Sequence, residues 1–244
     1  MSDIVSQVST SLDALTKEFE IITHNLANVS TTGYKRIRNA FSKALEEQSE
    51  GQQLYSPGEI ELNSAIDFSQ GSIVETGRTL DFALSGRGFF VVETPEGPLY
   101  RRSGVFGVND NGQIVDSEGR IVAGQGGPIT IPAGVNLTEL NVSSDGNISA
   151  GGASIGKFNI VDFNDDVNKL IPAGLNCYLM PEEDITPVQA DNFIIKQGYQ
   201  EASNVQIVDE LVDMIMVTRL YEANMDFVQA QKEASSSIMS VAMG

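Results

Sequence analysis

The chain offers few of the side chains that usually carry catalysis. Its 244 residues include one histidine, His24, and one cysteine, Cys177. A nucleophile needs a base within hydrogen-bond reach and a third group that orients the base, and no neighbour in the sequence completes such a set. A structural zinc site usually needs four nitrogen or sulfur ligands, which one histidine and one cysteine cannot supply. These residues favour a protein that is not an enzyme and that binds no cofactor or metal.

Acidic and glycine-containing turns raise the alternative of a calcium or nucleotide site. In an EF-hand loop the invariant glycine is the sixth residue and the first residue supplies an oxygen ligand. Aligning Gly112 with that glycine puts Gly107 in the first ligand position, and aligning Gly119 puts an isoleucine there. The run 86–88 (Gly-Arg-Gly) lacks the third glycine of a dinucleotide loop, because Val91 takes that place. Neither kind of loop fits the sequence.

The acidic excess of the chain limits the classes of partner. Lys and Arg number 15 and Asp and Glu number 33, which leaves a formal net charge of −18. Phosphate backbones and anionic membrane surfaces would repel such a chain, so we expect no nucleic-acid partner. No apolar run approaches the roughly 18–20 residues of a membrane span, and the first twenty residues lack the pattern of a cleaved signal peptide. We therefore expect neither membrane insertion nor signal-peptide cleavage.

The strongest helical pattern lies at the end of the chain, from about Glu201 to Gly244. Ser203 and Gln206 have the spacing of a capping box. Two neighbouring apolar stripes follow at helical spacing, and their members are Met216, Leu220, Ala223, Phe227, Ala230, Ala234, Ile238 and Val241 in one and Leu211, Met214, Thr218, Tyr221, Met225 and Val228 in the other. Together they form a wider apolar surface than the seam of a two-stranded coiled coil. Such a surface needs partners, either in the same chain or in other copies.

A second helix is predicted at the amino terminus. Its apolar residues repeat every 3.5 residues on average, as in a narrow helical seam, and they are Ile4, Val8, Leu12, Leu15, Phe19, Ile22, Leu26 and Val29. The pattern stops at the Ser-Thr-Thr-Gly run 30–33, which favours leaving the helix. Pairing the two terminal helices would cover one face of the C-terminal helix and leave its other stripe open.

The middle of the chain has a polar arm, followed by the alternation of short apolar runs and turns that is typical of a β-rich domain. Residues 46–72 contain few apolar residues and a Pro-Gly turn, which is typical of an extended linker. From Gly77 to about Gly198, short apolar runs alternate with turn dipeptides. Asn111-Gly112 and Asp145-Gly146 are hairpin signals, because such turns require positive φ. This regular spacing favours a small antiparallel sandwich or barrel.

The predicted fold class is α+β, with long N- and C-terminal helices packed as a coiled-coil-like pair, a central antiparallel β-rich domain and an extended arm. The predicted boundaries are 1–33 for the N-terminal helix of an axial core, 34–76 for the arm or linker, 77–200 for the β-rich outer domain and 201–244 for the C-terminal helix of the core.

Three blocks of sequence resemble the bacterial flagellar rod and hook proteins. The first is the run from Asn25 to Arg36 (NLANVSTTGYKR), similar to the amino-terminal signature of that family. The second resembles its carboxy-terminal signature and comprises EASNV at 201–205, ELVDMI at 210–215 and RLYEAN at 219–224. The third resembles its β-domain core and comprises GRGFFVV at 86–92, YRRSG at 100–104 and NGQIV at 111–115. These blocks lie in the expected order and span nearly the whole chain.

Within that family the length of the chain favours a rod protein. Hook proteins usually carry a large extra β-domain, for which this chain has no room. The short arm at 46–72 and the runs at 126–132 and 144–148 resemble the proximal-rod branch. The distal-rod branch and a short hook-type protein are the alternatives within the family.

The resemblance implies a structural subunit that polymerises helically into a hollow drive shaft, which transmits torque and conducts exported subunits. It implies partners among copies of itself, other rod proteins, hook and ring components and the flagellar type III export apparatus. It also implies a place in the periplasm-spanning rod of the basal body. The alternative from another class is a secreted β-domain that binds glycan or calcium and carries a helical oligomerising stalk. The lack of tryptophan weakens a glycan-stacking site.

We expect the assembly interface to lie on the two terminal helices. Its predicted apolar members are Leu12, Leu15, Phe19, Ile22, Leu26, Leu211, Ile215, Leu220, Phe227 and Ile238. Its predicted polar members, which would form hydrogen bonds between subunits or between the two helices, are Asn25, Asn28, Asn204 and Arg219. Capping and solvation within one chain is the alternative for these four.

Overall fold

The computed structural model of the protein describes residues 2–39, 64–181 and 185–243, with the side chains of 8–234 in those ranges. The chain divides into two compact units. The helical unit comprises 1–29, 37–66 and 205–244, and the β unit comprises 30–36 and 67–204. Most of the predicted arm at 46–72 lies outside the described residues, and its described end, 64–72, enters both units.

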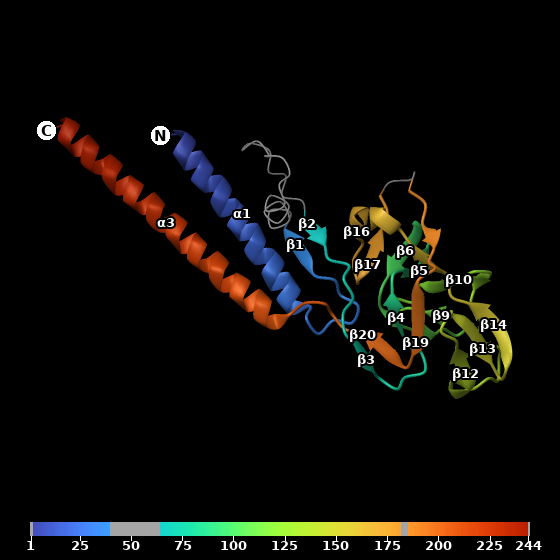
Figure 1. The fold of residues 1–244 in the computed structure, drawn as a ribbon. Helices are drawn as coiled ribbons and strands as arrows, with labels where there is room; N and C mark the ends of the chain where they lie inside the picture. The colour runs from blue at the N-terminus through green and yellow to red at the C-terminus, as the bar shows by residue number, and fades with distance from the viewer. Residues whose placement is uncertain (1, 40–63, 182–184, 244) are drawn as a thin grey trace. The chain divides into compact units, whose positions relative to one another are not determined.

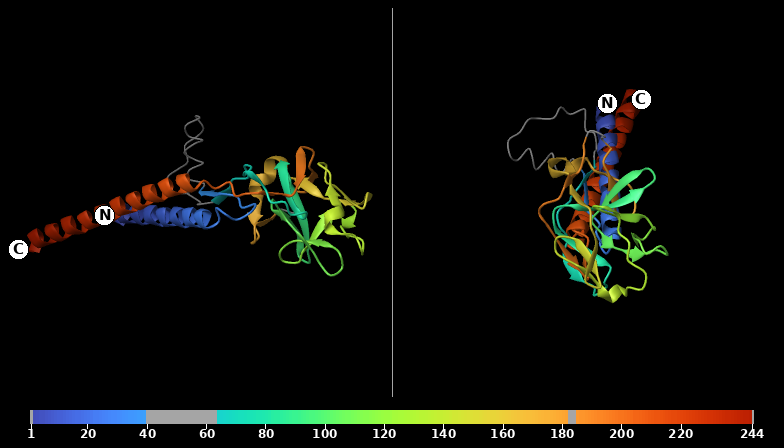
Figure 2. Two further views of the ribbon diagram at one scale, coloured as in Figure 1. Left: turned by 90° about the horizontal axis from the view of Figure 1, so that it is seen from below. Right: turned by 90° about the vertical axis from the view of Figure 1, so that its right-hand side faces the viewer.

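The helical unit contains α1 (Ser2–Ala27), α3 (Ile207–Met243) and a two-stranded ribbon of β1 (Ile37–Asn39) and β2 (Ser64–Ile66) (Figure 1). The two helices lie side by side in Figure 1 and in the further views of Figure 2, and β1 packs against α1. No proline interrupts α3, and Asp209 and Glu210 in its first turn suit the positive end of the helix dipole.

The prediction of long helices packed as a coiled-coil-like pair is wrong. The described part of the chain is mostly β-sheet, with one helix towards each end. In a coiled coil, apolar residues of both helices are buried along the whole seam. Here the buried side chains in the described parts of the helices are Ile22 and Asn25 in α1 and Glu210 and Val217 in α3. Most large apolar side chains in the described part of α3 are exposed, so the buried part of the contact is partly polar and discontinuous. The broader α+β composition fits.

The β unit is built from short strands joined by tight turns. Their bounds are β3 (Ile73–Glu75), β4 (Asp81–Gly86), β5 (Phe89–Thr94), β6 (Gly97–Arg101), β7 (Gly104–Val105), β8 (Gly107–Val108), β9 (Ile114–Val115), β10 (Ile121–Gly124), β11 (Gly127–Pro128), β12 (Leu140–Val142), β13 (Asn147–Ala150), β14 (Ala153–Lys157), β15 (Ile160–Asp162), β16 (Ile171–Pro172), β17 (Cys177–Leu179), β18 (Val188–Gln189), β19 (Phe193–Gln197) and β20 (Tyr199–Glu201). Two 3-10 helices, η1 (Leu137–Glu139) and η2 (Asn164–Lys169), complete the described part of this unit.

Strand β5 lies at the centre of the largest sheet. It pairs antiparallel with β6, β10 and β15, which places Phe90 opposite both Arg101 and Ile160 and Val92 opposite Val122. One smaller sheet contains β19, β4 and β7, and another contains β12, β13 and β14. Strands β20 and β3 form a two-stranded sheet. The described pairings are antiparallel, as the alternation of short strands and turns predicts.

The predicted hairpin turns are present at both dipeptides. Gly112, between β8 and β9, has φ +77, and Gly146, between β12 and β13, has φ +86. Both values lie in the left-handed region that glycine adopts without a steric penalty. The register of these hairpins therefore follows from local sequence.

Phenylalanine rings fill the centre of the β unit. Phe82, Phe90, Phe106 and Phe158 are all at most 2% exposed. The ring centroids of Phe82 and Phe158 lie 5.1 Å apart, and those of Phe90 and Phe106 lie 5.2 Å apart, both edge to face. This arrangement places the positive edge of one ring against the negative face of the next. The rings fix how the sheets pack on each other.

Candidate assembly surface

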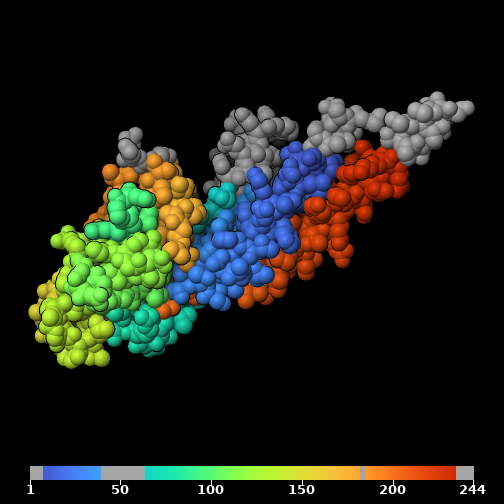
Figure 3. Space-filling model, turned by 180° about the vertical axis from the view of Figure 1, so that it is seen from behind, coloured from blue at the N-terminus to red at the C-terminus, as the bar shows by residue number. Residues whose placement is uncertain are grey.

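The main surface feature of the helical unit is the set of exposed apolar side chains on α3, which we call its open face. Ten large apolar side chains in its described part are exposed, from 42% for Tyr221 to 71% for Val208. The other eight are Ile207, Leu211, Val212, Ile215, Met216, Leu220, Met225 and Phe227. In the space-filling view of Figure 3, α3 in orange to red lies along α1 in blue. Helix α1 covers only one side of α3, and the opposite side remains in contact with solvent.

The predicted apolar interface residues differ in how far they are buried. In α1, Ile22 is buried, Phe19 is 42% exposed, and Leu12, Leu15 and Leu26 are half-buried. In α3, four predicted residues belong to the open face, namely Leu211, Ile215, Leu220 and Phe227. Ile238 belongs to α3, but its side chain lies outside the described residues. Leu211 and Ile215 lie on one side of α3 and Leu220 and Phe227 on another, because the nine residues from Leu211 to Leu220 turn the helix by half a revolution. The α1 set is shared between the contact with α3 and the outside.

The side chain of Asn25 joins three elements of the helical unit. Its Nδ2 donates to the carbonyl of Ile37 at 2.8 Å, and its Oδ1 accepts from the N–H of Ile37 at 2.9 Å. Nδ2 also lies 3.3 Å from Oε2 of Glu210 in α3. Asn25 and Glu210 are both at most 1% exposed. Because a buried polar group is costly unless it is hydrogen-bonded, this contact requires α1, β1 and α3 to keep one alignment.

Asn204 has the corresponding role at the edge of the β unit. Its Oδ1 accepts from the N–H of Arg36 at 2.7 Å, and its Nδ2 donates to the carbonyls of Asp67 and Ser69 at 2.8 and 3.1 Å. The amide thus links residues that are more than 130 positions apart in the sequence. The bonds described for Asn25 and Asn204 lie within one chain.

Asn28 and Arg219 make local contacts. Nδ2 of Asn28 donates to the carbonyl of His24 at 2.9 Å, one turn earlier. Arg219 forms an exposed ion pair with Glu222 at 3.1 Å. Exposed pairs at this spacing stabilise a helix by only about 0.3–0.5 kcal/mol.

A buried ionic cluster in the β unit was not anticipated from the sequence. Nζ of Lys35 lies 2.6 Å from Oε1 of Glu201, and a guanidinium nitrogen of Arg102 lies 2.9 Å from Oε2 of the same carboxylate. Burial lowers the pKa of Lys35 below its ordinary value, although the charge of Glu201 opposes that shift. We call these three residues the Glu201 cluster.

A second buried group surrounds Asp116. Its Oδ2 lies 2.8 Å from Arg101 and 2.7 Å from Arg120, and Arg120 also donates to the Sγ of Cys177 at 3.3 Å. Burial opposes ionisation of Asp116, but hydrogen bonds from Arg120 and the charge of Arg101 outweigh it and lower the pKa of this carboxyl. Burial raises the pKa of the Cys177 thiol, so the thiol is not activated as a nucleophile.

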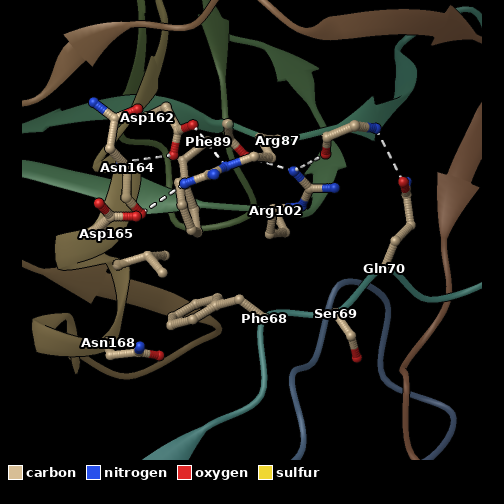
Figure 4. A pocket seen from close by; sticks show the side chains of 13 residues that line it. Phe68, Ser69, Gln70, Arg87, Phe89, Arg102, Asp162, Asn164, Asp165 and Asn168 are labelled. Atoms are coloured by element: carbon tan, nitrogen blue, oxygen red, sulfur yellow. Dashed lines mark hydrogen bonds and ion pairs between the residues drawn. The ribbon is translucent and has the colours of Figure 1, made fainter.

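The β unit also contains a cavity of about 720 Å³ beside the turn between β4 and β5, lined in part by Phe68, Phe89, Arg87 and Asp162 (Figure 4). Arg87 forms an ion pair with Asp162 at 3.0 Å and donates to the carbonyl of Asn164 at 2.6 Å. These polar groups of the lining therefore bond to one another. Among the described residues, no cluster of three or more His, Cys, Asp or Glu side chains has the geometry of a metal site. None of the described helices has the length and apolar character needed to cross a membrane.

Comparison with known proteins gives the same family in two segments and over most of the chain. Residues 83–150 match the family model of the flagellar hook protein FlgE/F/G D1 domain, and residues 196–241 match that of the flagellar basal body rod FlgEFG protein C-terminal. The chain is 32% identical to the flagellar basal-body rod protein FlgG of Buchnera aphidicola subsp. Acyrthosiphon pisum, over 88% of this chain and 90% of the relative. This chain belongs to the family of flagellar basal-body rod proteins.

Two further relatives show the breadth of the match. The rod protein FlgF of Caulobacter vibrioides is 32% identical over 91% of each chain. The rod protein FlgG of Bacillus subtilis is 28% identical over 92% of this chain and 93% of the relative. The resemblance identified from the sequence is therefore confirmed, and the family is one of structural proteins of the flagellar rod. The matches do not favour the alternative of a secreted ligand-binding β-domain.

The two matched models of the rod family cover different parts of the structure. The first runs from β4 to the end of β13, and the second begins in β19 and covers β20 and most of α3. Arg102 lies in the first match and Glu201 in the second. The three members of the cluster lie in the runs NLANVSTTGYKR, YRRSG and EASNV, but the sequence of these runs does not show that the three charges meet.

Proposed function

We propose that this rod protein polymerises helically through its terminal helices, with the open face of α3 covered by neighbouring copies and by other rod proteins. The observation that carries the proposal is the set of ten exposed large apolar side chains on α3. Isolated exposed apolar residues are common, but so many of them on one helix mark an interaction surface. A contact between unlike faces of successive copies produces an open helical polymer when the rotation does not close.

The energy available from covering this face is large enough to drive assembly. Full burial of one leucine, isoleucine or phenylalanine side chain stabilises a structure by about 1.5–3 kcal/mol. Several such side chains on α3 already lie on one element, so few additional groups need ordering when a neighbour covers them. Leu211, Ile215, Leu220 and Phe227 are the residues that we assign to this interface, together with Phe19 of α1.

The finer features of the proposal come from the family resemblance. In this proposal the polymer is a hollow shaft that transmits torque and conducts exported subunits. The chain reaches the rod through the flagellar export apparatus and contacts hook and ring components as well as other rod proteins. We propose the proximal rod as its place, from the short arm and the runs at 126–132 and 144–148.

The test compares two isoleucines with similar exposure. Ile215 on α3 is 62% exposed and Ile194 on β19 is 51% exposed. We expect Ile215→Asp to raise the protein concentration required for assembly at least about tenfold, since the lost burial is worth about 1.5–3 kcal/mol per contact. Ile194→Asp serves as the matched control and is expected to assemble like the unchanged protein. Assembly is followed by sedimentation and electron microscopy.

Both substitutions lie at exposed positions, so the free energy of unfolding of the monomer should change by no more than about 0.5 kcal/mol. Denaturant unfolding of both variants checks that requirement. Equal assembly of Ile215→Asp and the unchanged protein would contradict the proposal, as would an equal loss of assembly in both variants.

A further inference from the structure

Three stretches of the β unit adjoin positions where the chain passes between the two units. The unit boundaries fall at 29/30, 36/37, 66/67 and 204/205. We call residues 30–36, 67–71 and 199–204 the crossing segments, because each ends at or begins from one of these boundaries. They lie far apart in the sequence and meet within the β unit.

Glu201 connects all three crossing segments, since it belongs to one of them and its carboxylate bonds to the other two. It belongs to the third, its Oε1 accepts from Nζ of Lys35 in the first at 2.6 Å, and the same oxygen accepts from the N–H of Gly71 in the second at 3.0 Å. Lys35 also donates to the carbonyl of Ser69 at 2.7 Å. The backbone carbonyl of Glu201 accepts from the N–H of Gly33 at 2.7 Å.

Arg102 connects this carboxylate to the β4–β5 turn. Its Nε and a terminal nitrogen lie 3.0 and 2.9 Å from Oε2 of Glu201. Its remaining donors bond to the carbonyls of Leu84, Gly86 and Gly88 at 2.6–3.1 Å. The side chains of Lys35 and Glu201 are fully buried and that of Arg102 is 4% exposed.

We propose that Glu201 is a positioning residue that ties the three crossing segments to one another and, through Arg102, to the β4–β5 turn. A carboxylate suits this task because its two oxygens accept several hydrogen bonds at once. An apolar side chain would fill the same space without fixing which backbone groups meet. Buried ionic groups are often neutral for stability compared with apolar replacements, whereas loss of one partner is strongly unfavourable. The cluster therefore defines one arrangement of the crossing segments.

The mechanical consequence of this arrangement rests on the proposed function. In a shaft under torque, force applied to the helices reaches the β unit through the covalent crossings. When the Glu201 cluster holds the crossings together, they share that load. When the cluster is broken, each crossing is loaded separately.

Amide hydrogen exchange on the full-length monomer tests the positioning role. Lys35→Met removes the cation and keeps a straight side chain, and Glu201→Gln removes the charge and keeps an acceptor for Gly71. For either variant we expect exchange about tenfold or more faster in all three crossing segments, and unchanged exchange in β5 and β10. Lys169→Met, which breaks the exposed Lys169–Asp166 pair, is the matched control and should leave the crossing segments unchanged.

The distribution of the effect decides the outcome. Faster exchange confined to the substituted segment would overturn the proposal, and so would uniform acceleration across β5 and β10, which would make the cluster a general core contact. If Lys35→Met does not fold, Glu201→Gln alone decides between these results. Failure of the proposed function appears differently, as a lack of assembly by the unchanged protein with the exchange pattern intact.

Discussion

At the scale of single residues, two asparagine side chains act as if they were peptide groups. An amide side chain carries a donor and an acceptor at nearly the spacing of a backbone N–H and C=O. Asn25 uses both atoms to pair with the backbone of Ile37, and Asn204 uses both to hold Arg36 beside Asp67 and Ser69. Each amide thus bonds to the backbone in the way that a peptide group does.

Asp116 gives the β unit a pH-dependent contribution to its stability. Its pKa in the folded protein is below the ordinary value of 3.8, because hydrogen bonds from Arg120 and the charge of Arg101 outweigh the effect of burial. Between the lowered pKa of the folded protein and 3.8, the carboxyl of the unfolded chain therefore binds more protons than that of the folded protein. The free energy of unfolding rises with pH across that range. We expect Asp116→Asn to lower the free energy of unfolding by about 3 kcal/mol at pH 7.

The difference in free energy of unfolding between Asp116→Asn and the unchanged protein should shrink as the pH falls below 3.8 and through the lowered pKa of Asp116. The unchanged protein then loses the same charge by protonation. Urea unfolding at pH 7, 5 and 3 measures it. Asp110→Asn, at an exposed turn, is the control and should have little effect at pH 7. A constant difference between Asp116→Asn and the unchanged protein at all three pH values would exclude this ionic origin.

Local sequence predicts the turn conformation of some residues but not the long-range contacts of others. The hairpins at Gly112 and Gly146 were predictable, because the required positive φ is a property of the turn itself. The contact between Lys35 and Glu201 was not, since it joins residues 166 positions apart and neither belongs to a repeating pattern. The sequence contains both charges, but only the fold brings them together.

At the scale of elements, the apolar stripes predicted where helices form but not which neighbours cover them. The spacing of Leu12, Leu15 and Phe19 satisfies a heptad, yet a heptad buries its residues only if the facing helix offers matching holes. The side of α3 that faces α1 presents Glu210 and Val217, seven residues apart and of different polarity. The predicted coiled-coil-like pair fails for this reason.

We expect the isolated monomer to exchange amide hydrogens faster in the described parts of α1 and α3 than in β4, β5 and β10. Exposed helices with few buried side chains open locally at low cost, whereas the central strands open only with the core. Exchange in the assembled polymer serves as the comparison and should be slower in both helices. Equal protection of α3 in monomer and polymer would mean that neighbouring copies do not cover it.

At the scale of the whole molecule, the net charge of −18 opposes the association of identical copies. Among the described residues, the basic side chains Lys35, Arg101 and Arg102 are buried, and so are the acidic side chains Asp81, Asp116, Asp162, Glu201 and Glu210. Burial therefore removes slightly more acidic than basic groups, and most of the acidic excess stays at the surface. Assembly has to overcome this repulsion through the apolar contacts of the helices.

Assembly should become more favourable as salt rises from about 10 mM to about 150 mM. The screening length falls from about 30 Å to about 8 Å over that range, so repulsion between neighbouring copies weakens while apolar burial persists. Sedimentation at fixed protein concentration measures the effect. The Ile215→Asp variant is the control and should stay dispersed at both concentrations. Weaker assembly at higher salt would show that attraction between opposite charges, and not apolar burial, holds the copies together.

The division into two units also fixes an order of folding. The helical unit is assembled from both ends of the sequence, and its contact between Asn25 and Glu210 spans 185 positions. The β unit lies almost entirely between those ends, and its hairpins close through short loops, although its contact between Lys35 and Glu201 spans 166 positions. Because long-range contacts form late, after the local ones have brought their partners near, the β unit can form first and shorten the distance that remains. The helix pair is thus the last part of the chain to close, and the first to lose its structure when the chain is pulled apart.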